Sequence, residues 1–127
     1  RGVDVGINVS DLEKSRAFYR DFVGLQELPP VHDDALGVTK YPFRNGETTI
    51  SLWSIGKKLP ADTGSAGIQY VIDNVDAVNA RALEQKVAIE EPLGTIPGFD
   101  VRFVWLNDPD GVTNYFAQTG ASATPAK

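Results

Sequence analysis

A chain of 127 residues with 42% hydrophobic and 23% charged residues is long enough for one globular domain with its own core. The net charge of −5 argues against a protein that binds a nucleic acid backbone, and no apolar run approaches the ~20 residues of a membrane helix. The absence of cysteine excludes disulfides and thiolate metal sites, and a single histidine excludes sites that need two imidazoles. We expect a cytoplasmic protein without nucleic-acid or membrane partners.

The N-terminal segment predicts a strand followed by a helix. Apolar residues alternate with polar or small ones from Val3 to Val9, which is the period of a half-buried strand. Ser10, with Glu13 three residues later, predicts a capping box at the start of the helix. Gly24 suits the left-handed residue that ends a helix.

The remainder of the first half predicts a series of short strands. An exposed loop is expected at residues 31–37, which contain His32 beside two aspartates. Asn45-Gly46 has the composition of a hairpin turn. The expected strands cover residues 26–28, 38–43 and 48–54.

The second half repeats this plan. Residues 67–72 alternate like the first strand, and Asn74 stands 63 residues after Asp11 as the next helix cap. A short strand at 87–89 is expected to end at Glu90-Glu91-Pro92, before a surface loop over 93–100. Strands at 101–106 and 112–118 then flank a tight turn at 107–111.

The repetition predicts one α+β domain, residues 1–127, built from two modules. Each module reads strand-helix-strand-strand-strand, or βαβββ. The expected modules are 3–55 and 67–119, joined by a Gly- and Pro-containing linker at 56–66 and followed by a tail at 120–127.

The segments VGINVSDLEKSRAFYRDFVGL, VIDNVDAV and FVWLNDPDGVTNYFAQ together resemble the vicinal oxygen chelate superfamily. This group includes glyoxalase I, bleomycin resistance proteins and extradiol dioxygenases. The resemblance spans nearly the whole chain. It implies that the sheets of the two modules curl around a cleft in an open barrel, commonly in a homodimer.

The resemblance also implies four positions that bind a divalent ion in the metal-using members of the group. In this sequence they are Asp4, Ser51, Gly67 and Tyr115. Only the aspartate is an ordinary ligand for such an ion, and glycine has no side chain at all. We therefore expect no metal and no other cofactor.

Alternation along the strands predicts which side chains face the cleft. The set mixes small residues, amides, hydroxyls and large aromatics, which suits a small organic ligand with an apolar or aromatic body. Simple packing of the two large aromatics in a barrel or dimer interface is the alternative. The candidate ligand-binding residues are Asn8, Thr49, Ser51, Trp53, Gly67, Gln69 and Thr113.

Three functions remain open from the sequence. The first is a metal-independent protein that binds a small molecule, like the drug-sequestering members of the group. The second is an isomerase, lyase or dioxygenase-like enzyme that uses a divergent metal site, or uses Asp4 as general base and Tyr115 as hydrogen-bond donor to an oxyanion. The third is a fold retained for interaction with another chain.

Overall fold

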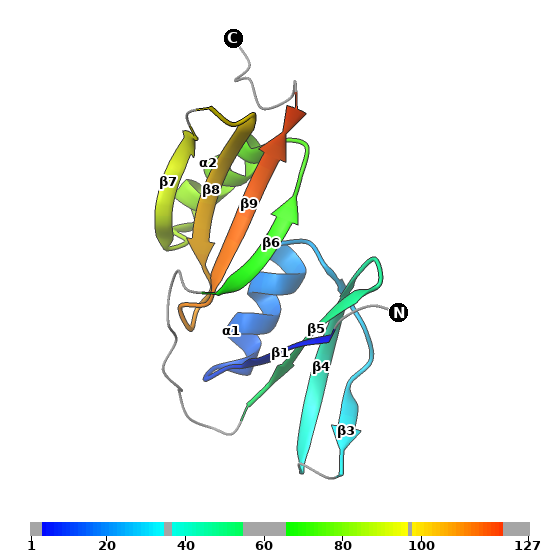
Figure 1. Ribbon diagram of the computed structural model, residues 1–127. Coiled ribbons are helices and arrows are strands. Elements are labelled where there is room, and N and C mark those ends of the chain that lie inside the picture. The colour runs from blue at the N-terminus through cyan, green and yellow to red at the C-terminus, as the bar shows by residue number, and fades with distance from the viewer. Residues whose placement is uncertain (1–3, 35–36, 55–65, 97, 121–127) are drawn as a thin grey trace. The chain divides into compact units, whose positions relative to one another are not determined.

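A computed structural model describes residues 4–34, 37–54, 66–96 and 98–120 (Figure 1). The chain has an α+β fold with two separate sheets, as predicted. It divides into two compact units, Arg1–Pro60 and Ala61–Lys127. The linker and tail predicted at 56–66 and 120–127 fall almost entirely outside the described residues, so these boundaries stay predictions.

The first unit contains a mixed sheet in the order β1-β5-β4-β2, with β3 also paired to β4. The first strand runs parallel to β5, and the other pairs are antiparallel. Ile50 and Leu52 of β5 are buried on one face, as the alternation predicts. The strands are β1 (Asp4–Asn8), β2 (Gln26–Glu27), β3 (Val31–Asp33), β4 (Val38–Asn45) and β5 (Thr48–Trp53).

The helix of the first unit begins one residue later than predicted. Asp11, and not Ser10, is the N-cap of α1 (Leu12–Ala17), because its carboxylate accepts a hydrogen bond from the Lys14 backbone N–H. The helix continues as the π-helical turn η1 (Phe18–Phe22). Gly24 then adopts the predicted left-handed conformation, with φ of 86°.

The loop predicted at 31–37 is partly a strand. Residues 31–33 pair with β4 as β3, and His32 lies on it with Nδ1 3.2 Å from Thr39 Oγ1. The diproline at 29–30 separates β2 from β3 without ending the pairing along β4. The predicted loop was wrong for residues 31–33, because polar side chains also occur on exposed strands.

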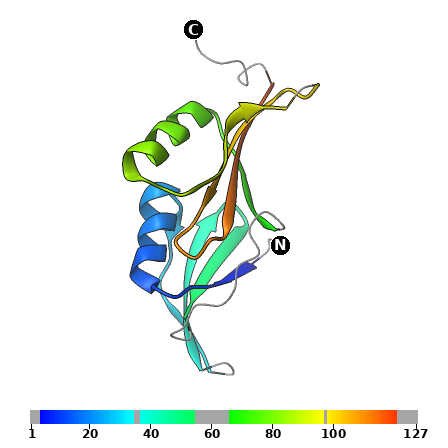
Figure 2. The same cartoon turned by 90° about the vertical axis from the view of Figure 1, so that its left-hand side faces the viewer.

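The second unit is a four-stranded sheet in the order β6-β9-β8-β7, with α2 on one face (Figure 2). Its element order is strand-helix-strand-strand-strand, as predicted. Tyr70, Val104 and Phe116 are buried on the face toward α2. The elements are β6 (Gly67–Val71), α2 (Val75–Gln85), β7 (Ile89–Thr95), β8 (Val101–Asn107) and β9 (Thr113–Thr119).

Two side chains cap the N-terminus of α2. Asn74 Oδ1 accepts from the Ala77 N–H at 3.0 Å, which confirms the predicted cap. Gln118 of β9 is buried and accepts from the Val75 N–H at 2.7 Å. Both bonds satisfy N–H groups that have no partner within the helix, so Gln118 ties α2 to the sheet.

The strand predicted to end at Glu90 continues to Thr95 as β7. Pairing with β8 shifts register between Ile89 and Glu91 and again between Glu91 and Gly94. These β-bulges allow Pro92 to lie within a strand at the edge of the sheet. The predicted break was therefore wrong.

The turn predicted at 107–111 is confirmed. Asp108 Oδ1 accepts from the Asp110 and Val112 N–H groups at 2.9 and 2.8 Å, and Gly111 has φ of 89°.

The described part of the chain contains no helix that is long and apolar enough to span a membrane.

Candidate functional site

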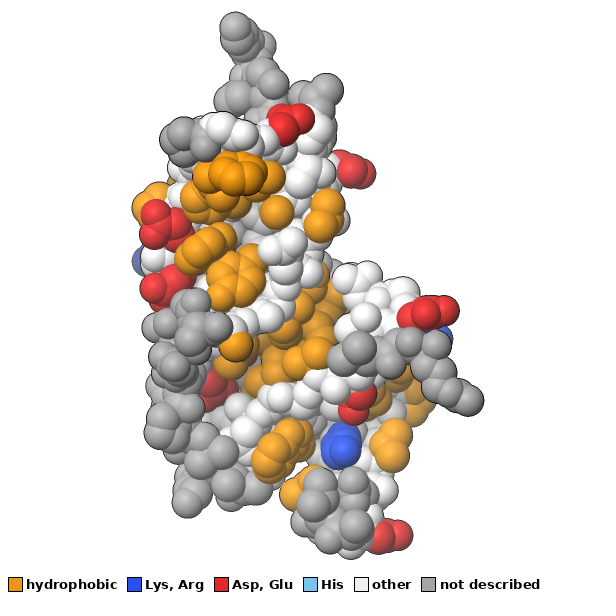
Figure 3. All heavy atoms as spheres, in the orientation of Figure 1, with side chains coloured by type: hydrophobic (Ala, Val, Ile, Leu, Met, Phe, Trp, Pro, Cys, Tyr) orange, Lys and Arg blue, Asp and Glu red, His pale blue; other side chains and the backbone are white. Residues whose placement is uncertain are grey.

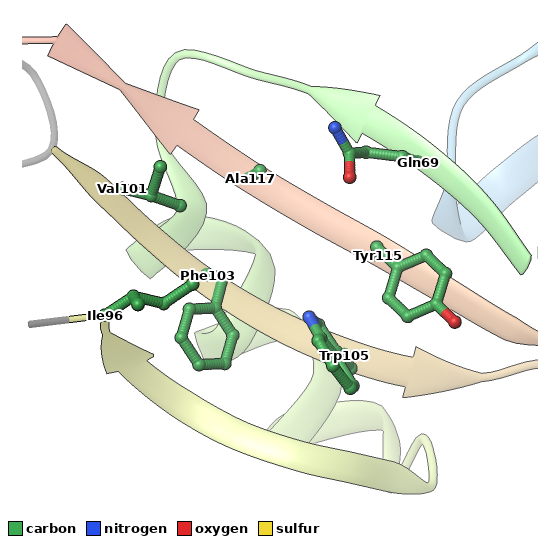
Figure 4. Close-up of a pocket in the computed structure, with 7 residues that line it drawn as sticks. All are labelled: Gln69, Ile96, Val101, Phe103, Trp105, Tyr115 and Ala117. Carbon is green, nitrogen blue, oxygen red and sulfur yellow. The ribbon is translucent and has the colours of Figure 1, made fainter. Parts of the chain in front are cut away.

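The face of the second sheet opposite α2 carries an apolar pocket (Figure 4). Its volume is about 290 Å³. Strand alternation creates it, because every second residue of β8 and β9 points away from the helix. The lining residues are Gln69, Ile96, Val101, Phe103, Trp105, Tyr115 and Ala117.

Three aromatic rings form the floor of this pocket. The Trp105 and Tyr115 ring centroids are 4.8 Å apart in an edge-to-face arrangement at 84°, and Phe103 lies 5.8 Å from Trp105. Edge-to-face pairs are a preferred geometry between aromatic rings. Figure 3 shows hydrophobic side chains gathered on this face of the second sheet. The rings offer flat apolar surface to a ligand.

Gly67 makes the position of the Tyr115 ring feasible. A Cβ atom at residue 67 would lie 2.7 Å from Tyr115 Cε2, and it would also meet the carbonyl oxygen of Thr113. Residue 67 pairs with Thr113 on the neighbouring strand. The tyrosine ring therefore fills the space that any side chain at residue 67 would need.

Few polar groups line the pocket, and none of the described residues that line it is charged. Gln69 comes from β6 in register with Tyr115, and its carboxamide lies above the sheet between β6 and β9 (Figure 4). Trp105 Nε1 adds a hydrogen-bond donor. The pocket thus combines apolar contact with a small number of orienting groups.

A polar row, formed by Thr113, Asn107 and Glu90, crosses the same face of the sheet next to the rings. Thr113 Oγ1 donates to Asn107 Oδ1, and Asn107 Nδ2 donates to Glu90 Oε1, each at 2.9 Å. Thr113 is fully buried and pairs with Asn107 across β8 and β9. The row links β9, β8 and β7 next to the aromatic floor.

The other face of the same sheet is occupied by structural contacts. Arg102 binds Asp76 through Nε and Nη2 at 2.9 and 2.7 Å, and these bonds lower the pKa of the Asp76 carboxyl. Tyr70 donates to Asn114 Oδ1 at 2.8 Å, and burial raises the pKa of its phenol. These contacts stabilise the packing on the α2 face of the sheet and do not contribute to the pocket.

The first unit brings several of the predicted site residues together. Asp4 Oδ1 accepts from Thr49 Oγ1 and from Ser51 Oγ, each at 2.7 Å. The Trp53 indole lies along Gly6, since a Cβ at residue 6 would be 3.6 Å from Nε1. The carboxylate lies on β1, the edge strand of its sheet.

Asn8 also belongs to this face of the first unit. Both polar atoms of its carboxamide are buried and have no hydrogen-bond partner among the described residues. It pairs with Trp53 across β1 and β5. A buried carboxamide of this kind can hydrogen-bond a ligand or water.

The sequence-predicted residues therefore divide between the two units. Gln69 and Tyr115 line the pocket of the second unit, Gly67 adjoins it, and Thr113 lies in the polar row. The remaining predicted residues, Asp4, Asn8, Thr49, Ser51 and Trp53, lie in the first unit. Because each unit is described by itself, the predicted cleft between modules and the pairing of Asp4 with Tyr115 stay predictions.

Two residues of the pocket floor, Phe103 and Trp105, were not predicted from the sequence. Phe103 and Trp105 alternate with Val104 and Leu106 along β8, and the buried pair faces α2. The same period that was used for the first strand would have placed both aromatics on the open face. The positions implied by the family resemblance include neither aromatic residue.

The four positions implied for a metal ion do not fit one in this chain. Gly67 offers no donor, and the Tyr115 ring excludes any side chain there. Asp4 is the single ordinary ligand of the set, and Ser51 already donates to it. Within the described ranges, no group of three or more His, Cys, Asp or Glu residues is arranged to hold a metal ion.

Comparisons with known proteins agree with this fold. The family model of the Glyoxalase/Bleomycin resistance protein/Dioxygenase superfamily matches residues 3–116. The uncharacterized protein YwkD of Bacillus subtilis (strain 168) is 30% identical over 111 residues, which cover 84% of this chain and 87% of that protein.

Two solved structures extend the comparison. TnmS3, an antibiotic binding protein from Streptomyces sp. CB03234, is 28% identical with a TM-score of 0.71, over 92% of this chain and 93% of that chain. The fosfomycin resistance protein FosX from Listeria monocytogenes is 16% identical with a TM-score of 0.75, over 94% and 93%. The likeness to FosX shows the fold alone.

Proposed function

We propose a function from one established premise: the chain belongs to the glyoxalase/bleomycin resistance protein/dioxygenase superfamily. The proposed function is metal-independent binding of a small organic molecule with an aromatic body. The observation that carries it is the pocket of about 290 Å³ with Phe103, Trp105 and Tyr115 as its floor. This volume lies near the lower end of the range for small-molecule sites, roughly 300–1,000 Å³.

The composition of the pocket favours ligand binding rather than catalysis. The described lining residues have aromatic and aliphatic side chains and one carboxamide, and they include no acid, base or metal ligand beyond the Tyr115 phenol. Aromatic ligands gain from stacking and edge-to-face contact with such rings, by about 0.5–1.5 kcal/mol for each pair beyond area burial. The antibiotic-binding protein TnmS3 gives a precedent for binding on this fold.

The test is a calorimetric titration of chelator-treated protein with 1-naphthalenemethanol, a neutral bicyclic aromatic alcohol. We expect saturable binding with unit stoichiometry, and a rise in the melting temperature because the ligand binds the native state. The Trp105→Ala variant is expected to lose this binding. Binding that requires added divalent metal would refute the proposal, as would equal binding by the variant.

An enzymatic function is the second candidate, favoured by the position of Asp4. Its carboxylate is held by two hydroxyl donors on an exposed edge strand, where it could accept a proton from a substrate. The proposal would then be an isomerase or lyase that acts through Asp4 with Tyr115. Turnover that survives in Asp4→Asn would exclude this use of the carboxylate.

We further propose that the protein is a cytoplasmic homodimer, as members of the group commonly are dimers. Sedimentation equilibrium of the purified chain tests the dimer, and a monomer at micromolar concentration would contradict it. Fractionation of the source cells tests the location.

A further inference from the structure

Glu90 of β7 lies next to the pocket, because its carboxylate is hydrogen-bonded to Asn107, two residues along β8 from Trp105. Ile89 pairs with Leu106 and Glu91 with Trp105, so three residues of β7 span two of β8, and Glu90 is the additional one. Ile89 shares the α2 face with Leu106, so alternation turns Glu90 to the pocket face. The bulge turns Glu91 to that face as well, because Glu91 pairs with Trp105, and bulges often lie next to functional sites.

A hydrogen-bonded network fixes the Glu90 carboxylate. Oε1 accepts from Asn107 Nδ2, and Asn107 Oδ1 accepts from Thr113 Oγ1, which sets the orientation of the amide. Asn107 and Trp105 are two residues apart on β8 and lie on the same face of the sheet. The carboxylate is therefore held at the end of the aromatic floor.

No described cation neutralises this carboxylate. Among the described residues, the pocket lining contains no Lys, Arg or His, and no ion pair to Glu90 occurs. Arg102, on the neighbouring strand, is bound to Asp76 on the opposite face. Half-buried Glu90 and exposed Glu91 make this edge of the pocket negative.

We infer that Glu90 selects ligands that carry a protonated amine next to their aromatic body. This inference rests on the proposed function, since it concerns a ligand of the same pocket. The amine would meet the carboxylate, which is already oriented by Asn107, while the ring system packs on Trp105 and Tyr115. Aromatic faces attract cations as well, so both features favour the same ligand class.

The experiment compares three ligands that share a naphthalene ring and differ in charge. They are 1-naphthylmethylamine, which is cationic at pH 7, neutral 1-naphthalenemethanol and anionic 1-naphthoic acid. For the wild-type chain we expect the amine to bind roughly five- to tenfold more tightly than the alcohol at low salt, and the acid to bind most weakly. The preference is expected to shrink as salt is raised.

Glu90→Gln is the decisive variant, because glutamine keeps an oxygen that can accept from Asn107 Nδ2. The ratio of amine to alcohol affinity should fall toward one, while the affinity for the alcohol stays the same. Glu84→Gln on the exposed surface of α2 is the matched control, since it removes an equal charge away from the pocket. It should preserve the ratio.

The possible failures are distinct. If none of the three ligands binds, the proposed function fails. If the alcohol binds but the amine has no advantage, or if Glu90→Gln keeps the full advantage, the role of Glu90 is overturned while the binding function stands. An equal loss of preference in Glu84→Gln would show a general charge effect and would also overturn it.

Discussion

Gly67 on β6 lies diagonally across from Tyr115 on β9, because Gly67 pairs with Thr113 and Gln69 pairs with Tyr115. The glycine leaves room for a ring where a larger residue would push that ring away. The ring then packs edge-to-face on Trp105. One small residue thus determines the position of an aromatic surface.

Gly67→Ala tests this close approach. The new Cβ would collide with the Tyr115 ring and with the Thr113 carbonyl, so we expect a loss of stability of about 1–3 kcal/mol, as for other overpacked sites. Gly94→Ala is the control, because its Cβ would lie 3.7 Å from Pro92 O and 3.9 Å from Phe103 Cζ. Urea unfolding measures both. Equal stability of the two variants would show that residue 67 is not crowded.

Variants of Tyr115 distinguish a binding role of its ring from a chemical role of its hydroxyl. If its ring acts only as a surface, Tyr115→Phe keeps the affinity for 1-naphthalenemethanol and Tyr115→Ala weakens it about tenfold, the equivalent of one aromatic pair. Calorimetry gives both affinities. A Tyr115→Phe variant that binds as weakly as Tyr115→Ala would show that the hydroxyl, and not the ring, makes the contact.

At the scale of elements, α2 is attached to its sheet by two side chains at its N-terminus. Asn74→Ala should cost about 1 kcal/mol of stability, the usual value for a lost cap. Gln118→Ala should cost more, because it leaves the Val75 N–H without its buried acceptor. Denaturant titration tests this order, and a Gln118→Ala cost below that of Asn74→Ala would contradict it.

The ion pair between Arg102 and Asp76 gives stability a dependence on pH. The hydrogen bonds from Arg102 lower the pKa of Asp76 in the folded state. The stabilisation is therefore complete above the ordinary carboxyl pKa, about 4, and is lost as pH falls through the lowered value.

The Asp76→Asn variant measures this contribution. The Asp76 side chain is 45% exposed, so we expect a stability difference from wild type below about 1 kcal/mol at pH 7. The difference should shrink as pH falls below about 4, because the wild-type carboxylate then becomes protonated. Paired unfolding curves at pH 7 and pH 3 test the sign. A difference that grows on acidification would be inconsistent with the lowered pKa.

Much of the fold was accessible from local patterns, since period-two alternation predicts β1, β5 and β6, and Asn74 predicts the start of α2. The register shifts of β7 could not be predicted, because a bulge depends on pairing with β8 and leaves no clear mark in the sequence. The π-helical turn at 18–22 could not be predicted from the sequence pattern either. Pro92 suggested an end of the strand, but an edge strand tolerates it.

The candidate site was predicted less completely than the fold. Positions carried over from the resemblance lead to Gly67 and Tyr115, which do meet in the structure. They do not lead to Phe103, Trp105 or Glu90, because the family pattern assigns no role to those positions. Alternation on β8 locates the two rings, whereas the place of Glu90 depends on the pairing of β7 with β8 and on its hydrogen bond with Asn107.

For the whole molecule, we propose that the aromatic face of the second unit binds an aromatic ligand without a metal ion. The chain has two tryptophans, Trp105 in that pocket and Trp53 in the first unit, so each unit carries one indole N–H signal. These two signals report on the two units separately in a nitrogen-15 NMR spectrum.

The most direct measurement is an NMR titration of chelator-treated protein with 1-naphthalenemethanol. We expect a saturable shift of the Trp105 indole signal and of the Gln69 side-chain amide, with the Trp53 signal unchanged. A shift confined to Trp53, or no shift at Trp105 until a divalent metal ion is added, would contradict it.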